Sequence, residues 1–179
     1  MKVFLVHVRD PQFYAVPSNT RAKNGRLRVM GFPPIGVMSL AAVLKRAGHD
    51  VVMFDQANPE TPDAFIIGVM LRQRPDLVGL SFLSTTSYPY AKILARQMRA
   101  ADANVKIAFG GVFATLNARL IKMQVPEVDF VCRGDGEQLI LDLLDRLDDP
   151  ATVTGVTWQE GDGTLRHNPD RLLDGDLDR

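Results

Sequence analysis

The sequence predicts an α/β fold in which a five-stranded parallel sheet is covered by helices on both faces. Five short apolar segments alternate with segments of helical periodicity over residues 1–150, which is the pattern of repeated strand–helix–strand units. The apolar segments contain few polar residues, as do strands whose sheet is buried on both faces. The expected strands are Val3–Val8, His49–Asp55, Leu77–Leu83, Val105–Phe109 and Val128–Cys132.

Helical segments connect these strands, and the ends of two of them carry recognisable signals. The first helix is expected at Ile35–Ala47, because Gly48 follows it and glycine commonly ends a helix. The second is expected to begin with Thr61 as its N-cap and Pro62 in its first turn, and to run to Arg74. Three further helices are expected. One has Tyr90, Ile93, Leu94 and Met98 on its apolar face, the next spans roughly Ala114–Met123, and the last has Ile140, Leu143, Leu144 and Leu147 at helical spacing.

The segment after residue 150 departs from this pattern and is expected to form an appendage. Gly161-Asp162 separates two short β-prone segments, at 155–160 and 163–167, as in a β-hairpin. We therefore expect an α/β domain at residues 1–150, followed at 151–179 by a hairpin and the start of a linker.

The charge balance gives no support to two classes of partner. Lysine and arginine total 21, aspartate and glutamate total 21, and the formal net charge is zero, so electrostatics offers no basis for binding nucleic acid or an anionic membrane. No segment approaches the roughly 20 apolar residues of a transmembrane helix, and the N-terminus lacks the pattern of a signal peptide. We therefore expect a cytoplasmic protein. A loose basic cluster, Arg21, Lys23, Arg26 and Arg28, lies in a long loop predicted at Asp10–Phe32, a length typical of functional or mobile loops.

Three loops share a composition that suits a ligand site. In an open parallel sheet, ligands bind outside the carboxyl ends of the strands. The segments expected there are Ser81–Ser87, Gly110–Thr115 and Arg133–Glu137, and all three are rich in glycine or hydroxyl side chains. Glycine lets the backbone approach a ligand closely, and the helix N-termini that follow offer free N–H groups. These features are equally typical of tight strand-to-helix turns, and the chemistry alone leaves a nucleotide, a flavin or a corrinoid open.

A family resemblance narrows that choice. The segment Pro33–Val51 resembles the first helix and second strand of the cobalamin-binding domain at the N-terminus of cobalamin-dependent radical SAM enzymes. Gly79–Leu83, Gly110-Gly111 and Gly134–Glu137 then fall where that family has its strand-end motifs. The resemblance covers nearly the whole chain and implies a flavodoxin-like (Rossmann-like) fold, with cobalamin as the cofactor.

The resemblance also implies which residues contact the cofactor. In the wider corrinoid-binding family, a Ser-x-Leu on the third strand and a Gly-Gly on the fourth line the pocket for the dimethylbenzimidazole nucleotide tail. Here these are Ser81 with Leu83, and Gly110 with Gly111. The hydroxyls that follow the third strand are expected to meet the corrin amides or the tail phosphate. The other residues expected to bind the cofactor are Ser84, Thr85, Thr86, Val112, Phe113, Gly134, Asp135 and Gly136.

Two motifs of related proteins are absent. His7 is followed by Val8, Arg9 and Asp10, which does not match the Asp-x-His-x-x-Gly motif whose histidine ligates cobalt in corrinoid mutases. By resemblance to the radical SAM members, this implies base-off binding without a protein histidine, and we predict no metal ligand in the chain. Cys132 is the only cysteine, so the chain cannot contain the Cys-x-x-x-Cys-x-x-Cys motif. A 4Fe–4S cluster and S-adenosylmethionine would belong to a separate radical SAM domain, in cis or in trans.

Three hypotheses about function follow, and none assigns a catalytic residue to this chain. The first is the cobalamin-binding module of a radical SAM enzyme, as a part of a longer methyltransferase. The second is a stand-alone corrinoid carrier or sensor. The third is a flavodoxin-like domain that binds a nucleotide or has a structural role. The sequence does not indicate the substrate, the lower axial ligand of cobalt or the oligomeric state.

Overall fold

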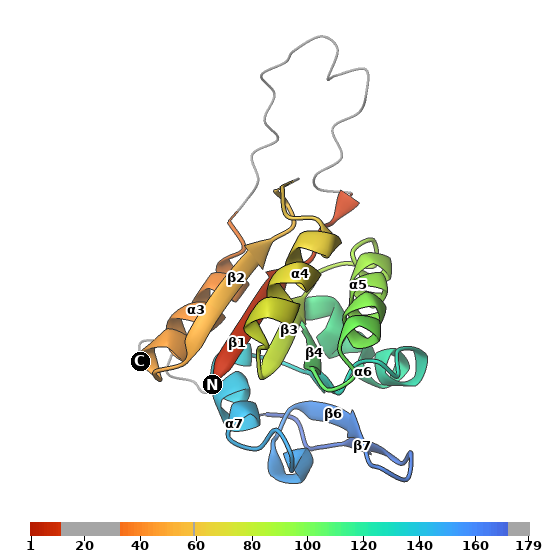
Figure 1. The fold of residues 1–179 in the computed structure, drawn as a ribbon. Helices are drawn as coiled ribbons and strands as arrows, with labels where there is room; N and C mark the ends of the chain where they lie inside the picture. The colour runs from red at the N-terminus through yellow and green to blue at the C-terminus, as the bar shows by residue number, and fades with distance from the viewer. Residues whose placement is uncertain (12–32, 59, 172–179) are drawn as a thin grey trace.

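The computed structural model describes residues 1–11, 33–58 and 60–171, and these form a sheet in the strand order β2-β1-β3-β4-β5-β6-β7 (Figure 1). The first five strands in this order are parallel, and β6 and β7 are antiparallel to their neighbours. The order reverses between β1 and β3, as in flavodoxin-like folds. The predicted parallel sheet is thus confirmed. The strands are β1 Lys2–His7, β2 Asp50–Asp55, β3 Leu77–Ser81, β4 Lys106–Gly110, β5 Phe130–Cys132, β6 Val156–Gln159 and β7 Leu165–His167.

Helices cover both faces of the sheet, as predicted. Helices α4, α5 and α6 pack on one face, and Figure 1 shows α4 and α5 on the side nearer the viewer. Helices α3 and α7 pack on the opposite face. The described helices are α3 Ile35–Arg46, α4 Asp63–Gln73, α5 Tyr88–Ala101, α6 Val112–Gln124, α7 Gly136–Leu144 and a short 3-10 helix, η1, at Pro150–Thr152.

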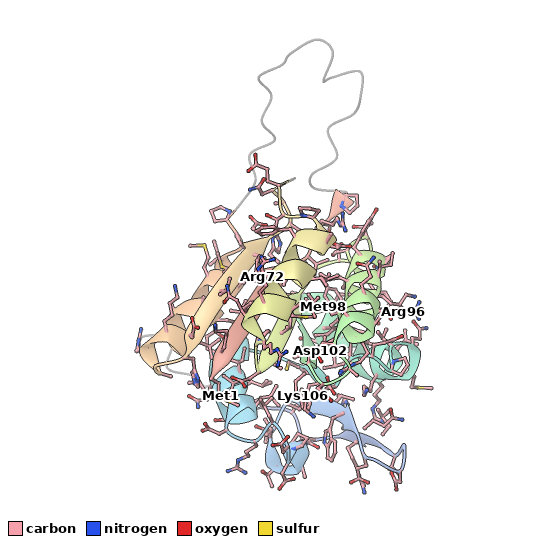
Figure 2. The ribbon with its side chains drawn as sticks, in the orientation of Figure 1. Met1, Arg72, Arg96, Met98, Asp102 and Lys106 are labelled. Atoms are coloured by element: carbon pink, nitrogen blue, oxygen red, sulfur yellow. The ribbon has the colours of Figure 1, made fainter. Side chains whose placement is uncertain are left out.

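The larger core lies under α4, α5 and α6 and contains the big side chains of the strands. Phe82 and Phe109 are fully buried there and meet edge to face, with ring centroids 5.0 Å apart. Figure 2 shows Met98 of α5 on the side toward the sheet and Arg96 on the outer side, in agreement with the predicted amphipathic helix. The described residues of these helices thus bury large side chains against this face of the sheet.

Several element boundaries differ from the predictions by one or two residues, and three of these differences concern helix starts or the ligand loops. Helix α4 has Pro62 as its N-cap and no side-chain cap hydrogen bond, so the predicted capping role of Thr61 is wrong. The reason is that the Pro62 carbonyl already accepts the first helical N–H groups. Strand β3 ends at Ser81 rather than Leu83, and α6 begins at Val112 rather than Ala114. Both shifts lie at the carboxyl edge of the sheet, where the predicted ligand loops begin.

The predicted C-terminal hairpin is confirmed, and it extends the sheet. Strand β6 pairs antiparallel with β5, and β7 pairs with β6. The Trp158 indole packs against the core under α3 and α7, and its Nε1 donates to Asn168 Oδ1 at 3.2 Å. The predicted division of the chain at residue 150 stays a prediction.

A buried arginine fixes the segment that follows the hairpin. Arg133 has 5% of its surface exposed, and its guanidinium donates to the Thr157 hydroxyl at 2.5 Å and to the Asn168 carbonyl. It also forms an ion pair with Asp170 at 2.9 Å, but the Asp170 side chain is 82% exposed. The two buried acceptors, rather than the exposed carboxylate, are therefore the partners that depend on this arginine.

Replacing Arg133 by leucine is expected to lower the free energy of unfolding by about 3 kcal/mol, because two buried acceptors lose their donor and each costs roughly 1–3 kcal/mol. Replacing Asp170 by alanine should cost less than about 1 kcal/mol, since exposed ion pairs contribute little. Urea denaturation of Arg133→Leu and Asp170→Ala measures both values. Equal losses in the two variants would show that the ion pair, and not the buried hydrogen bonds, holds this segment.

Some expectations fall outside the described residues. Residues 12–32 of the predicted long loop, with the basic cluster, are outside the described residues. Residues 172–179, where the linker is predicted, are outside them too. Among the residues that the structure describes, no helix combines the length and apolar character needed to cross a membrane.

Candidate functional site

A cavity of about 460 Å³ lies between the sheet and the two helices α3 and α7. Its outer rim is formed by the loops that follow β3, β4 and β5, at Leu83, Gly111 and Gly134. These loops stand at the carboxyl ends of parallel strands, which is where the sequence predicted a ligand to bind. The volume is in the range of small-molecule and cofactor sites, about 300–1,000 Å³.

The floor of the cavity is made of small residues on two neighbouring strands. Gly79 lies opposite Ala108, and Ser81 lies opposite Gly110, in the register of β3 and β4. All four line the cavity. Side chains alternate between the two faces of a strand, and the alternate positions on these strands, such as Leu80, are large and belong to the core on the other face. The cavity therefore exists because small residues occupy only one face of β3 and β4.

The walls are formed by the first turns of α3 and by most of α7. Gly136 of α7 lies so close to Leu40 of α3 that a Cβ atom built on it would be 2.9 Å from Leu40 Cδ2. The Ser39 hydroxyl donates to Glu137 Oε1 at 2.7 Å, which ties the two helices together. These contacts join the helices on the far side of the cavity from the sheet.

Exposure falls steadily from the rim to the inner end. At the rim, the exposed fractions are 56% for Leu83, 57% for Val112 and 77% for Leu116. At the inner end, Leu77 and Leu143 are fully buried. The cavity is thus open to solvent at the carboxyl edge of the sheet and closed at the amino edge.

Two adjacent glycines at the end of β4 have different roles. Gly111 has a φ of 94°, and a Cβ atom there would lie 2.4 Å from the Phe82 carbonyl oxygen. Only glycine fits this position. Gly110 has no positive φ, and a Cβ atom there would meet nothing within 4 Å. Its missing side chain leaves open space in the cavity.

One polar side chain at the rim, Thr115, links two of the loops. The Thr115 hydroxyl donates to the Gly111 carbonyl and accepts from the Gly134 N–H, both at 3.1 Å, so it links the loops after β4 and β5. The Cys132 thiol also lines the cavity, and burial raises its pKa to about 12. This thiol is therefore neutral at physiological pH and adds no charge to the site.

Most residues predicted to bind a ligand meet at this cavity. The predicted residues that line it are Ser81, Leu83, Gly110, Gly111, Val112, Gly134, Asp135 and Gly136. They come from three loops that are far apart in the sequence and adjacent in the sheet. Their contact with a cofactor stays a prediction.

Four predicted residues do not line the cavity. Ser84 and Thr86 donate hydrogen bonds to the buried Asp10 carboxylate, at 2.5 Å for Thr86, and Thr85 is exposed. Phe113 stacks on Tyr88 with ring centroids 5.1 Å apart and packs against the core under α4, α5 and α6. Their contacts with corrin amides or the tail phosphate stay predictions, and any such contact would lie outside the cavity.

The sequence did not predict the remaining two thirds of the lining. Gly79 and Ala108 lie two residues before Ser81 and Gly110, so the period-2 alternation of strands would have identified them. Helix positions such as Leu139 and Leu143 carried no such signal, because their apolar spacing fits a core helix equally well. Their place at a cavity follows from the topology, which puts α3 and α7 on the same face.

Histidines do not line the cavity. The Nδ1 atom of His7, at the end of β1, lies 2.8 Å from Asp55 Oδ1. His49 lies beside the N-terminal amine, and His167 Nδ1 lies 2.8 Å from the Thr157 hydroxyl in the hairpin. Within the described ranges, no group of three or more histidine, cysteine or acidic residues could hold a metal ion.

The model of the B12 binding domain family matches residues 29–144. The chain is 29% identical over 150 residues to the anaerobic magnesium-protoporphyrin IX monomethyl ester cyclase of Synechocystis, covering 82% of this chain and 30% of that protein. It is 31% identical over 157 residues to an uncharacterized methyltransferase of Pyrococcus horikoshii, covering 84% of this chain and 33% of that protein. The chain thus spans about a third of the length of these relatives.

Solved structures share the fold. The cobalamin-dependent S-adenosylmethionine radical enzyme OxsB, with aqua-cobalamin and S-adenosylmethionine bound, superposes with a TM-score of 0.76 at 19% identity, over 96% of this chain and 22% of that one. The radical S-adenosylmethionine methyltransferase TsrM of Kitasatospora setae superposes with a TM-score of 0.70 at 16% identity, over 99% of this chain and 30% of that one.

Proposed function

The chain belongs to the B12 binding domain family, and from this premise we propose that it holds cobalamin with the nucleotide tail inserted into the cavity between α3 and α7. The observation that carries the proposal is the floor of small residues, Gly79, Ser81, Ala108 and Gly110, on one face only of β3 and β4. A flat aromatic base needs such a floor, because larger side chains on that face would fill the space.

The residues of the cavity fit the parts of the tail. Gly110 leaves open space where a Cβ atom would stand, and the Ser81 hydroxyl, also on the floor, can hydrogen-bond the tail. The tail phosphate would lie at the rim, near the first turn of α6. That turn begins at Val112 and contains no acidic residue, so its free N–H groups and the helix dipole favour an anion.

The rim offers an apolar surface for the corrin ring. Leu83, Val112 and Leu116 are all more than half exposed at the mouth of the cavity. Exposed apolar side chains grouped in this way commonly mark a binding surface. Ser84, Thr85 and Thr86 follow Leu83 directly, and we propose that they lie beside the ring's amide groups. The hydroxyls of Ser84 and Thr86 already donate to Asp10, so their oxygens would accept from these amides.

We further propose that the module serves a cobalamin-dependent radical SAM enzyme, and specifically a methyltransferase. Support comes from the Pyrococcus relative, named a methyltransferase, and from a second one, the cytidylyl-2-hydroxyethylphosphonate methyltransferase of Streptomyces wedmorensis. Bound cobalamin supplies a cobalt ion suited to methyl transfer. The protein holds and orients the cofactor, and the 4Fe–4S cluster and S-adenosylmethionine would be bound by another domain, in cis or in trans. A stand-alone corrinoid carrier is the alternative.

The gene distinguishes these two roles. For the enzyme role, we expect the reading frame to continue beyond Arg179 into a Cys-x-x-x-Cys-x-x-Cys motif, or a neighbouring gene to encode that motif. A stop codon at this position without such a neighbour would contradict the enzyme role and favour the carrier.

Titration of the 179-residue chain with hydroxocobalamin tests cobalamin binding. We expect saturable binding at tens of micromolar or below, a range of about −6 to −8 kcal/mol, and an absorption spectrum of the base-off form. Absence of any spectral change in this range would contradict the proposal.

Within the base-off mode, we propose that no protein histidine of this chain ligates cobalt. His7→Ala is therefore expected to leave the spectrum of the bound cofactor unchanged, because His7 does not line the cavity. The measurement is the electron paramagnetic resonance spectrum of the reduced complex, in which an axial nitrogen ligand splits the cobalt signal. His167→Ala, in the distant hairpin, is the control. Nitrogen splitting that disappears only in His7→Ala would assign the ligand to His7.

A further inference from the structure

The inner end of the cavity is apolar, and we propose that it selects corrinoids whose lower base is an alkylated benzimidazole over those whose lower base is adenine. This inference rests on the proposed function, in which the nucleotide tail occupies the cavity. It adds the class of corrinoid that the site accepts.

The base must occupy the inner end because of the order of groups in the tail. Phosphate and ribose connect the corrin ring to the base, so the base is the part farthest from the ring. The phosphate is charged and stays near solvent, at the rim where Leu116 is 77% exposed. The base then reaches toward Leu77 and Leu143, which are fully buried.

The inner end offers only apolar side chains to the base. Its walls are leucines from three elements, β1, β3 and α7, and its floor is Gly79 and Ala108. The backbone groups of the floor are used in the pairing of β3 with β4. The leucines are Leu5, Leu77, Leu139 and Leu143, each exposed by 2% or less.

The polar side chains of the cavity lie away from the inner end. Ser81 and Cys132 are the last residues of β3 and β5, at the carboxyl edge. Thr115, Asp135 and Glu137 belong to the first turns of α6 and α7 or the loop before α7. Thr115 and Glu137 are already hydrogen-bonded to their neighbours. A base at the inner end therefore finds no side-chain donor or acceptor beside its six-membered ring.

The two bases differ in that ring. Dimethylbenzimidazole has only carbon in its six-membered ring and carries two methyl groups, whereas adenine has two ring nitrogens and an amino group there. Burial of these polar groups without partners costs free energy, while the methyl groups gain from burial. Apolar pockets discriminate against an added polar group by about ten- to a hundredfold. The leucine-lined end should therefore favour the benzimidazole by about that factor.

Titration of the chain with three corrinoids tests the inference. They are hydroxocobalamin, the corresponding cobamide with adenine as its lower base, and cobinamide, which lacks the nucleotide. We expect hydroxocobalamin to bind at least about tenfold more tightly than the adenine cobamide, and cobinamide to bind more weakly than hydroxocobalamin. Equal affinity for the two cobamides, with both above cobinamide, would overturn the inference and leave the proposed function intact. Equal binding of all three, or of none, would overturn the tail site itself.

A matched pair of variants tests whether the base touches the inner floor. Ala108 is 5% exposed and lies opposite Gly79. Ala108→Ser adds a hydroxyl beside the base, and Ala108→Cys adds a group of similar size that is a far weaker hydrogen-bonding partner. The preference for benzimidazole should fall at least about threefold in the serine variant relative to the cysteine variant, since a new partner reduces the penalty for adenine. Identical preferences in the two variants would show that the base does not reach Ala108.

Discussion

Replacing Gly110 by leucine is expected to weaken cobalamin binding by about a hundredfold or more while leaving the fold intact. A Cβ atom at Gly110 meets nothing within 4 Å, and the backbone there has no positive φ, so the side chain is accommodated in the cavity without strain. It then occupies the volume of the nucleotide base. Burial of an aromatic group of about 150 Å² at about 25 cal/mol per Å² contributes about 4 kcal/mol, and each 1.4 kcal/mol is a tenfold change in affinity.

The measurement is the hydroxocobalamin titration, with the midpoint of urea denaturation as the check on folding. Gly161→Leu is the matched control, because Gly161 lies in the distant hairpin turn and also has open space around it. We expect unchanged binding in this control. Binding by Gly110→Leu that equals that of the unsubstituted chain would place the nucleotide tail somewhere other than this cavity.

The sheet was predictable from the sequence because its strands are short apolar segments bounded by glycine, proline or polar residues. Segments such as Leu77–Ser81 and Lys106–Gly110 satisfy this rule, and errors were confined to one or two residues at their ends. The carboxyl-edge loops were predictable for the same reason. Once the strands are parallel, the residues at or just after their carboxyl ends, Ser81, Gly110 and Gly134, must share one edge.

The rotation of a helix about its axis was not predictable. Val112 and Phe113 are adjacent in the first turn of α6, but successive residues of a helix point about 100° apart. Val112 therefore lines the cavity, while Phe113 turns to the opposite face and stacks on Tyr88. The direction of the Ser84 hydroxyl was not predictable either, because its acceptor, Asp10, is 74 positions away in the sequence.

The cavity itself depends on a difference in side-chain size between the two faces of β3. In Gly79–Phe82, the residues alternate between the small floor of the cavity and the large core side chains Leu80 and Phe82. The sequence contains this alternation, but it indicates a cavity only if no helix side chain fills the space. Gly36 and Gly136, in the first turns of α3 and α7, have no side chain to extend into the cavity that they line. That information comes from packing between distant segments and not from any one of them.

Gly111→Ala is expected to lower the free energy of unfolding by about 3 kcal/mol or more, through two separable effects. The first is backbone strain, because a φ of 94° with a ψ of 179° is a conformation essentially restricted to glycine, which costs an L-residue of order 1–3 kcal/mol. The second is steric, because the Cβ atom would lie 2.4 Å from the Phe82 carbonyl oxygen, which is backbone and cannot rotate away. For a chain of this size the loss corresponds to a melting temperature lower by roughly 6–12 °C.

Two neighbouring glycines separate the strain from the clash. Gly134 has a φ of 77° but nothing within 4 Å of its Cβ position, and Gly110 has neither a positive φ nor a close neighbour. Gly134→Ala should therefore lose only the strain energy, about 1–2 kcal/mol, and Gly110→Ala should lose almost none. Thermal denaturation of the three variants is expected to order them Gly111, Gly134, Gly110 from most to least destabilised. If Gly111→Ala lost no more stability than Gly134→Ala, the loop after β4 would have room to move away from Phe82. In that case the outer wall of the cavity would not be the rigid support that a bound nucleotide tail requires.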